Sequence, residues 1–190
     1  MQFKSRVSKA ISVALLVPAI IGSIAFVQEV RAKDTALQGV NGPTASKLDI
    51  INELKQRGAF HKTLEGLTNA YNLDNDLKGK GPYTFFAPDD RAWSRMPEED
   101  VTSLFNNPKK LKEVLSYHVI KGKMYNCADL DSQKEVLNLQ GSLIKVSHKN
   151  DKNDKDEMYV DKARVKKGDI VCSNGIIHII DSPIMPALKK

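Results

Sequence analysis

The sequence of 190 residues is short of cysteine, of aromatic residues and of catalytic signatures. It has two cysteines, one tryptophan and 6% aromatic residues. It contains no Asn-x-Ser/Thr acceptor for N-glycosylation, no Gly-x-Ser-x-Gly, no His-Glu-x-x-His and no glycine-rich phosphate loop. The four histidines show no metal-ligand spacing. We therefore predict no enzymatic activity, no cofactor and no metal ion.

The remaining composition is that of an ordinary globular protein. Hydrophobic residues make up 41% of the chain and charged residues 27%, which excludes a disordered, collagen-like or polytopic membrane protein. We find no internal repeat, and the length suits one domain with one hydrophobic core.

The N-terminal stretch has the pattern of a secretory signal. Residues 1–9 carry three basic residues and no acid, the next 18 residues carry no charge, and residues 30–32 follow a small-x-small pattern. An uncleaved membrane anchor is the alternative, but Pro18 and Gly22 would interrupt its helix. We therefore predict a signal peptide at residues 1–32 and a location outside the cytoplasm, either periplasmic, secreted or at the cell surface.

The signal accounts for half of the net charge. The whole chain has 29 basic and 23 acidic residues, a net charge of +6. Without residues 1–32, 25 basic and 22 acidic residues remain, a net charge of +3. An exported domain with so small a charge is a poor candidate for nucleic-acid binding.

Both cysteines, Cys127 and Cys172, lie in the predicted mature part. An even pair in an exported protein suggests one disulfide bond. Two buried free thiols are the alternative.

Helices are predicted first along the chain and strands later. Residues 33–45 are polar and aperiodic, and predict a linker before a domain at residues 46–188. Apolar spacing and capping residues predict helices near residues 46–58, 60–71, 90–93, 97–105 and 107–118. Strands are predicted at residues 83–87, 136–139, 143–146, 158–160, 163–165, 170–172 and 176–180. This order, without βαβ alternation, indicates an α+β domain with a mainly antiparallel sheet and helices in its N-terminal half.

Three ordered motifs resemble those of a known family. Residues 84–93 (TFFAPDDRAW), residues 115–122 (LSYHVIKG) and residues 173–181 (SNGIIHIID) resemble the three signatures of the fasciclin domain. The resemblance covers nearly all of the predicted mature chain. It implies a fasciclin-like β-sandwich wedge with helices packed against it.

The same resemblance implies a secreted adhesion or interaction module without catalysis. Its expected partner is a cell-surface or matrix protein or polysaccharide, and self-association is possible within the family. The residues implied in partner binding are Tyr117, His118, Leu115, Val119 and Ile120. A buried His118 that hydrogen-bonds to the backbone and holds two motifs together is the alternative.

Two other functions remain open from the residues alone. An exported enzyme could use His118 or His178 with a nearby carboxylate, for which the sequence offers Asp89, Asp90 and Asp181. A polyanion-binding protein could use a basic strand made of Lys162, Arg164, Lys166 and Lys167. The acidic segment at residues 151–157 lacks the glycine and glutamate of a calcium loop, so a solvated hairpin tip is predicted there.

Overall fold

The computed structural model describes residues 46–150 and 156–186. Its helices are α1 (Ile50–Arg57), α2 (His61–Asn69), α3 (Leu73–Leu77), α4 (Asp90–Trp93), α5 (Glu98–Phe105), α6 (Pro108–Tyr117) and α7 (Cys127–Asp131). Its strands are β1 (Tyr83–Pro88), β2 (Val119–Lys121), β3 (Glu135–Leu137), β4 (Leu143–Asn150), β5 (Asp156–Val160), β6 (Ala163–Cys172) and β7 (Gly175–Ile180). The predicted signal peptide, the predicted linker and most of the predicted hairpin tip lie outside these residues. No helix in the described ranges is long and apolar enough to cross a membrane.

Local side-chain chemistry sets the ends of α1 and the start of α6, although the helix predicted near residues 46–58 begins only at Ile50. The carboxylate of Asp49 accepts a hydrogen bond from the Asn52 amide at 2.9 Å, and α1 ends at Gly58, whose φ of 65° suits glycine. Asn107 caps α6 by accepting a bond from the Lys110 amide, and Pro108 occupies the first helical position. These caps fix the start of the helix that carries the second motif.

The seven strands form one mixed sheet in the order β2-β1-β7-β6-β5-β4-β3. Five of the six neighbouring pairs are antiparallel, which confirms the prediction of a mainly antiparallel sheet. The exception is β1 with β7, which run parallel from Tyr83 beside Gly175 to Pro88 beside Ile180. The first and third motifs therefore lie side by side on neighbouring strands of the sheet.

Strand β1 is buried on both faces because a hydrophobic cluster lies on each side of it. Phe85 belongs to the first cluster, which joins β1 and β7 to helices α1–α6. Phe86 belongs to the second, which draws apolar residues from all seven strands and from Leu130 of α7. This double burial explains why residues 83–88 form a nearly continuous apolar run.

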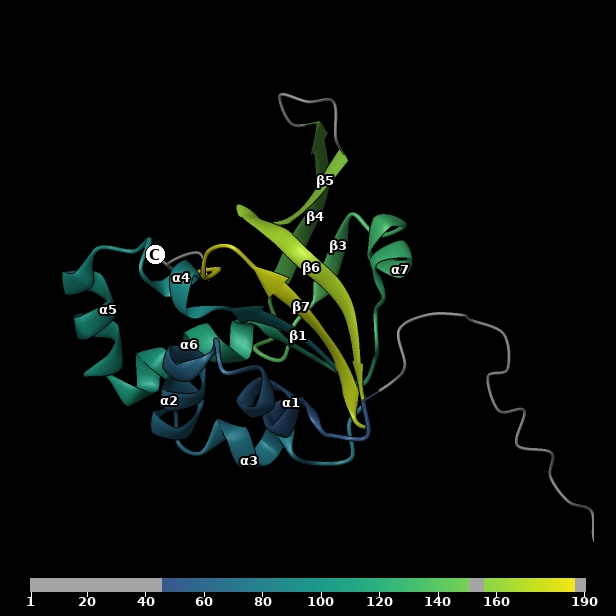
Figure 1. Ribbon diagram of the computed structural model, residues 1–190. Coiled ribbons are helices and arrows are strands. Elements are labelled where there is room, and N and C mark those ends of the chain that lie inside the picture. The colour runs from purple at the N-terminus through teal and green to yellow at the C-terminus, as the bar shows by residue number, and fades with distance from the viewer. Residues whose placement is uncertain (1–45, 151–155, 187–190) are drawn as a thin grey trace, which may run out of the picture. The chain divides into compact units, whose positions relative to one another are not determined.

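The sheet curls until its two edges approach each other. Leu139, which follows β3, donates a backbone hydrogen bond to the carbonyl of Val119 in β2 at 2.6 Å. Figure 1 shows α1, α2, α3 and α6 gathered along one side of β1 and β7, and α7 beside β3 and β4. The described part of the chain is thus a nearly barrel-shaped sheet with helices. The β-sandwich wedge that the resemblance implied is not confirmed.

Asn174 holds the turn between β6 and β7 against the N-terminal helices. Its Oδ1 accepts a hydrogen bond from the backbone of Ile50 at 3.0 Å. Its Nδ2 donates to the carbonyls of Leu77 at 2.7 Å and Gly79 at 2.8 Å. The Asn174 side chain therefore joins the turn to two segments that are distant from it in sequence, the start of α1 and the end of α3.

Candidate interaction site around Tyr117

The residues predicted to contact a partner lie where α6 passes directly into β2. Strand β2 pairs with β1, which is buried on both faces, so the junction lies against the core. The exposed fractions of the five side chains are 0% for Leu115, 5% for Tyr117, 0% for His118, 0% for Val119 and 3% for Ile120. All five side chains are therefore buried, and their part in partner binding stays a prediction.

His118 has the structural role that was the alternative at the sequence level. Its Nε2 accepts a hydrogen bond from the backbone amide of Ile184 at 3.0 Å, so the ring proton is on Nδ1, which donates to the carbonyl of Val114 at 2.8 Å. Complete burial lowers the pKa of His118 to about 4, against which the Val114 bond raises it. A neutral His118 therefore links α6 to the segment that follows β7.

Tyr117 is the member of the motif that approaches solvent. Its hydroxyl lies 3.0 Å from Oδ2 of Asp161 and 3.1 Å from the carbonyl oxygen of Leu143. Burial, reinforced by the Asp161 carboxylate, raises the pKa of Tyr117. Asp161 also accepts a bond from the Lys145 amide at 3.0 Å, so the turn between β5 and β6 is held against β4.

A hollow of about 650 Å³ opens beside this hydroxyl, and we call it the Tyr117 hollow. Its lining consists of Tyr117, Leu143, Lys145, Asp161, Lys162, Pro183, Ile184 and Met185. Leu143 is 52% exposed and Met185 is 43% exposed. Leu137, 60% exposed, lies directly opposite Leu143 in the β3–β4 pair and therefore on the same face. The rim of the hollow is apolar, with two lysines beside it.

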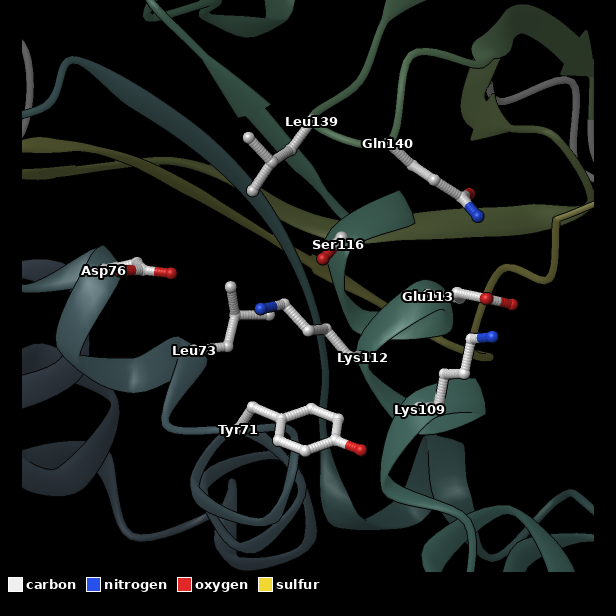
Figure 2. A pocket seen from close by; sticks show the side chains of 9 residues that line it. All are labelled: Tyr71, Leu73, Asp76, Lys109, Lys112, Glu113, Ser116, Leu139 and Gln140. Carbon is white, nitrogen blue, oxygen red and sulfur yellow. The ribbon is translucent and has the colours of Figure 1, made fainter.

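A second hollow, of about 430 Å³, lies between α3, α6 and the turn before β4. Figure 2 shows Leu139 and Gln140 on one side of it and Tyr71 on the other, with Lys112 between them in this view. Charged groups of both signs line it, among them Asp76 and Glu113. It shares no lining residue with the Tyr117 hollow.

The predicted basic strand is partly neutralised by acids of the same domain. Arg164 forms ion pairs with Glu157 and with Asp181, and Lys166 pairs with Asp89. Within the described residues, no ion pair is found for Lys162 or Lys167. Polyanion binding by this strand stays a prediction that would rest on two of its four cations.

The carboxylates that were considered as catalytic groups do not contact the buried histidines His118 and His178 in the described structure. Asp89 caps α4 at the Ala92 amide. Asp90 lies 2.9 Å from His61. Asp181 binds Arg95 and the backbone of Arg164, each at 2.9 Å. Among the described contacts, the three acids stabilise caps and turns and none touches His118 or His178.

The predicted Cys127–Cys172 disulfide is absent, and both cysteines are free thiols. Cys172 lies in the first hydrophobic cluster at the end of β6, with its sulfur 3.8 Å from the carbonyl of Ile170. Cys127 lies at the start of α7, where its sulfur is 3.8 Å from Nδ1 of His178. Among the described residues, a metal ion could be held by the group of Cys127, Asp169 and His178. Sequence spacing could not reveal it, because the three residues come from three separate segments.

Comparison with known proteins agrees with the motifs and the sheet. The fasciclin domain model matches residues 59–186. The chain belongs to the fasciclin domain family. The described fold is similar to a FAS1 domain pair from the insect cell adhesion molecule fasciclin I, with a TM-score of 0.62 and 19% identity, over 74% of this chain and 52% of that one.

Relatives of this fasciclin-domain chain occur in bacteria and in animals. It is 37% identical over 147 residues to protein sll1483 of Synechocystis sp., which covers 76% of this chain and 77% of that protein. It is 28% identical over 141 residues to the transforming growth factor-beta-induced protein ig-h3 of Sus scrofa, which covers 74% of this chain and 20% of that protein. The animal protein is thus several times longer than the matched region.

Proposed function

We propose that this chain is an exported, non-catalytic interaction module that binds a cell-surface or matrix component through the Tyr117 hollow. The observation that carries the proposal is the apolar rim of that hollow. Leu143 and Met185 line the hollow, and Leu137 lies beside Leu143 on the neighbouring strand. These three are among the five large hydrophobic side chains that are exposed in the described residues. Clustered exposed apolar side chains around a concave surface are typical of protein interaction sites.

The hollow combines features that favour specific recognition. Its walls come from α6, β4, the turn between β5 and β6, and the segment after β7. Hydrogen bonds of Asp161 to Tyr117 and to Lys145 join the turn to α6 and β4. The bond from Ile184 to His118 joins the last segment to α6. A preorganised surface loses little side-chain entropy on binding. Lys145 and Lys162 add positive charge beside the apolar rim, so a partner with an apolar side chain flanked by acids would be complementary.

The surrounding evidence supports an extracytoplasmic role. The similar insect structure belongs to a cell adhesion molecule, and residues 1–32 have the pattern of an export signal. The second motif contributes to binding indirectly in this proposal. Burial of His118 and its neighbours holds Tyr117 at the wall of the hollow, while the exposed rim makes the contact.

The test compares binding of labelled protein to intact cells and to isolated matrix from the source organism. Leu143→Glu places a charge on the rim, and Met124→Glu serves as the matched control because Met124 is exposed and lines neither hollow. We expect saturable binding by the wild type and by Met124→Glu. We expect Leu143→Glu to bind at least about tenfold more weakly, the loss typical of a central interface residue.

Thermal unfolding of each variant checks that the fold is retained, since both positions are exposed. The proposal fails if the wild type shows no saturable binding to either surface. It also fails if Met124→Glu loses as much affinity as Leu143→Glu.

A further inference from the structure

Three side chains of types that can bind metal ions lie close together, away from the Tyr117 hollow. Cys127 begins α7, Asp169 lies in β6 and His178 lies in β7. Their ligand atoms all lie within 4.8 Å of one another, and Sγ of Cys127 is 3.8 Å from Nδ1 of His178. In a tetrahedral zinc site, Zn–S and Zn–N bonds of usual length place sulfur and nitrogen about 3.5 Å apart. The thiol and the imidazole are therefore close to the spacing of shared ligands.

His178 is oriented as metal-binding histidines usually are. Its Nε2 donates a hydrogen bond to the carbonyl of Tyr125 at 2.7 Å, which leaves a lone pair on Nδ1. Among the described residues, the hydrogen-bonding neighbour of Nδ1 is the Cys127 sulfur alone. His178 is completely buried, so the ring cannot turn away into solvent. A backbone carbonyl that fixes the distal nitrogen is the usual outer partner of a histidine ligand.

The backbone around the cluster keeps room for a bound ion. A Cβ at Gly168 would lie 2.2 Å from the Cys127 sulfur and 3.0 Å from Nδ1 of His178, so a larger residue would fill the space between them. Asp169 has a φ of 59° and accepts a bond from the Cys127 amide at 2.7 Å. This bond holds its carboxylate beside the sulfur. Cys127 and Asp169 are half-buried, which leaves the cluster open on their side.

We infer that Cys127, Asp169 and His178 bind a divalent metal ion of the zinc class. On binding, the Cys127 thiol releases its proton, and the thiolate and the Asp169 carboxylate together balance the charge of the ion. The mixed sulfur, nitrogen and oxygen ligand set suits tetrahedral Zn²⁺ better than Ca²⁺ or Mg²⁺, which prefer oxygen ligands. Three protein ligands leave the fourth position for water or for a donor from another molecule.

The experiment titrates the reduced, purified protein with Co²⁺, which reports thiolate ligation through a charge-transfer absorption band. We expect the band to saturate at one equivalent and to disappear when Zn²⁺ is added. Cys127→Ser should abolish the band. Cys172→Ser should keep it, because Cys172 is buried in the first hydrophobic cluster and is not a member of the group formed by Cys127, Asp169 and His178.

Two further variants examine the other parts of the site. Asp169→Asn keeps a residue that tolerates positive φ and can still accept the Cys127 bond, so we expect a folded protein whose affinity falls at least about tenfold. Gly168→Ala should weaken binding by filling the space. Circular dichroism without metal checks the fold of every variant. The inference is overturned if the wild type gives no band, if the band survives Cys127→Ser, or if folded Asp169→Asn binds like the wild type.

Discussion

The imidazole Nε2 of His118 accepts a hydrogen bond from the backbone amide of Ile184, 66 positions further along the chain, at 3.0 Å. The bond joins the second motif to the segment that follows the third. Because Nε2 must be unprotonated to accept it, the folded state requires a neutral ring. The histidine of the motif is thus a structural element whose protonation opposes folding.

This requirement predicts that the free energy of unfolding decreases as the pH is lowered. Burial lowers the pKa of His118 to about 4, below its value in the unfolded chain, so the unfolded state takes up a proton first as the pH falls. The stability that neutral His118 contributes is complete above the pKa of this histidine in the unfolded chain. It is lost as the pH falls from about 6.5 to about 4. We expect His118 to account for a loss of about 2 kcal/mol in the free energy of unfolding between pH 7.5 and pH 5.

Urea unfolding at the two pH values measures this loss. His118→Gln cannot titrate, so its free energy of unfolding should be lower than that of the wild type at pH 7.5 but should change less between the two values. The pKa of His178 is also lowered by burial, so some pH dependence should remain. An equal change in wild type and variant would contradict the prediction.

Removal of the Asn174 side chain should destabilise the domain more than removal of an ordinary cap. Asn174→Ala leaves three backbone groups, at Ile50, Leu77 and Gly79, without their partner, and we expect a cost of about 3 kcal/mol. Asn107→Ala, the matched control, removes one capping bond at the exposed start of α6 and should cost about 1 kcal/mol. Denaturant unfolding compares the two. Equal costs would show that the three Asn174 bonds do not add to stability.

Loss of the Tyr117 hydroxyl should weaken both the fold and the hollow. Tyr117→Phe removes the contacts to Asp161 and to the Leu143 carbonyl, for which we expect a cost of about 1 kcal/mol in unfolding and weaker surface binding. Tyr71→Phe is the control, since Tyr71 is 62% exposed and lines the second hollow. If Tyr117→Phe binds as strongly as the wild type, the Tyr117 hydroxyl does not contribute to binding.

The paired and unpaired cations of β6 should respond differently to charge reversal. Arg164→Glu breaks ion pairs with Glu157 and Asp181 and places a third carboxylate beside them, so its unfolding temperature should fall. Lys167→Glu breaks no ion pair within the described residues and should leave the unfolding temperature nearly unchanged. Retention on a polyanion column, measured for both, would then test the basic-strand hypothesis without interference from unfolding in the second variant.

Both thiols should be available for alkylation once the protein is unfolded. The structure contains no Cys127–Cys172 bond, so denatured protein that has not been reduced should gain two alkyl groups by intact mass. Native protein should react first at Cys127, because Cys172 is buried. A gain of two groups only after reduction would restore the disulfide hypothesis.

Local sequence signals predicted most of the helices and strands. The candidate sites, in contrast, depend on contacts between residues that are far apart in the sequence. Gly58 and Asn107 mark helix ends through interactions with residues three positions away, so their sequence context was sufficient. Asp49 caps the first helix in the same way, but the start of that helix was predicted near residue 46. The parallel pairing of β1 with β7 joins residues some 90 positions apart, and no local pattern encodes it. The capping box of Asn126 with Asp129 could have revealed α7, which was not predicted.

The same distinction explains what was missed at the sites. The resemblance singled out Tyr117 and His118, but their burial depends on the pairing of β2 with the fully buried strand β1, which no local pattern shows. The grouping of Cys127 and Asp169 with His178 requires the positions of α7, β6 and β7 in space. The sequence shows the residue type at each of these positions, but it does not show which residues lie beside it in the folded chain.

The hydrogen bond from Leu139 to Val119 limits how a partner can attach. The terminal strands of the sheet, β2 and β3, have three residues each, and this bond draws them together. Exposed sheet edges are the places where a foreign strand adds by backbone pairing, and short edges that meet each other offer little length for it. In the interaction that we propose, recognition should therefore depend on side chains, and single surface substitutions are expected to change binding while the backbone stays the same.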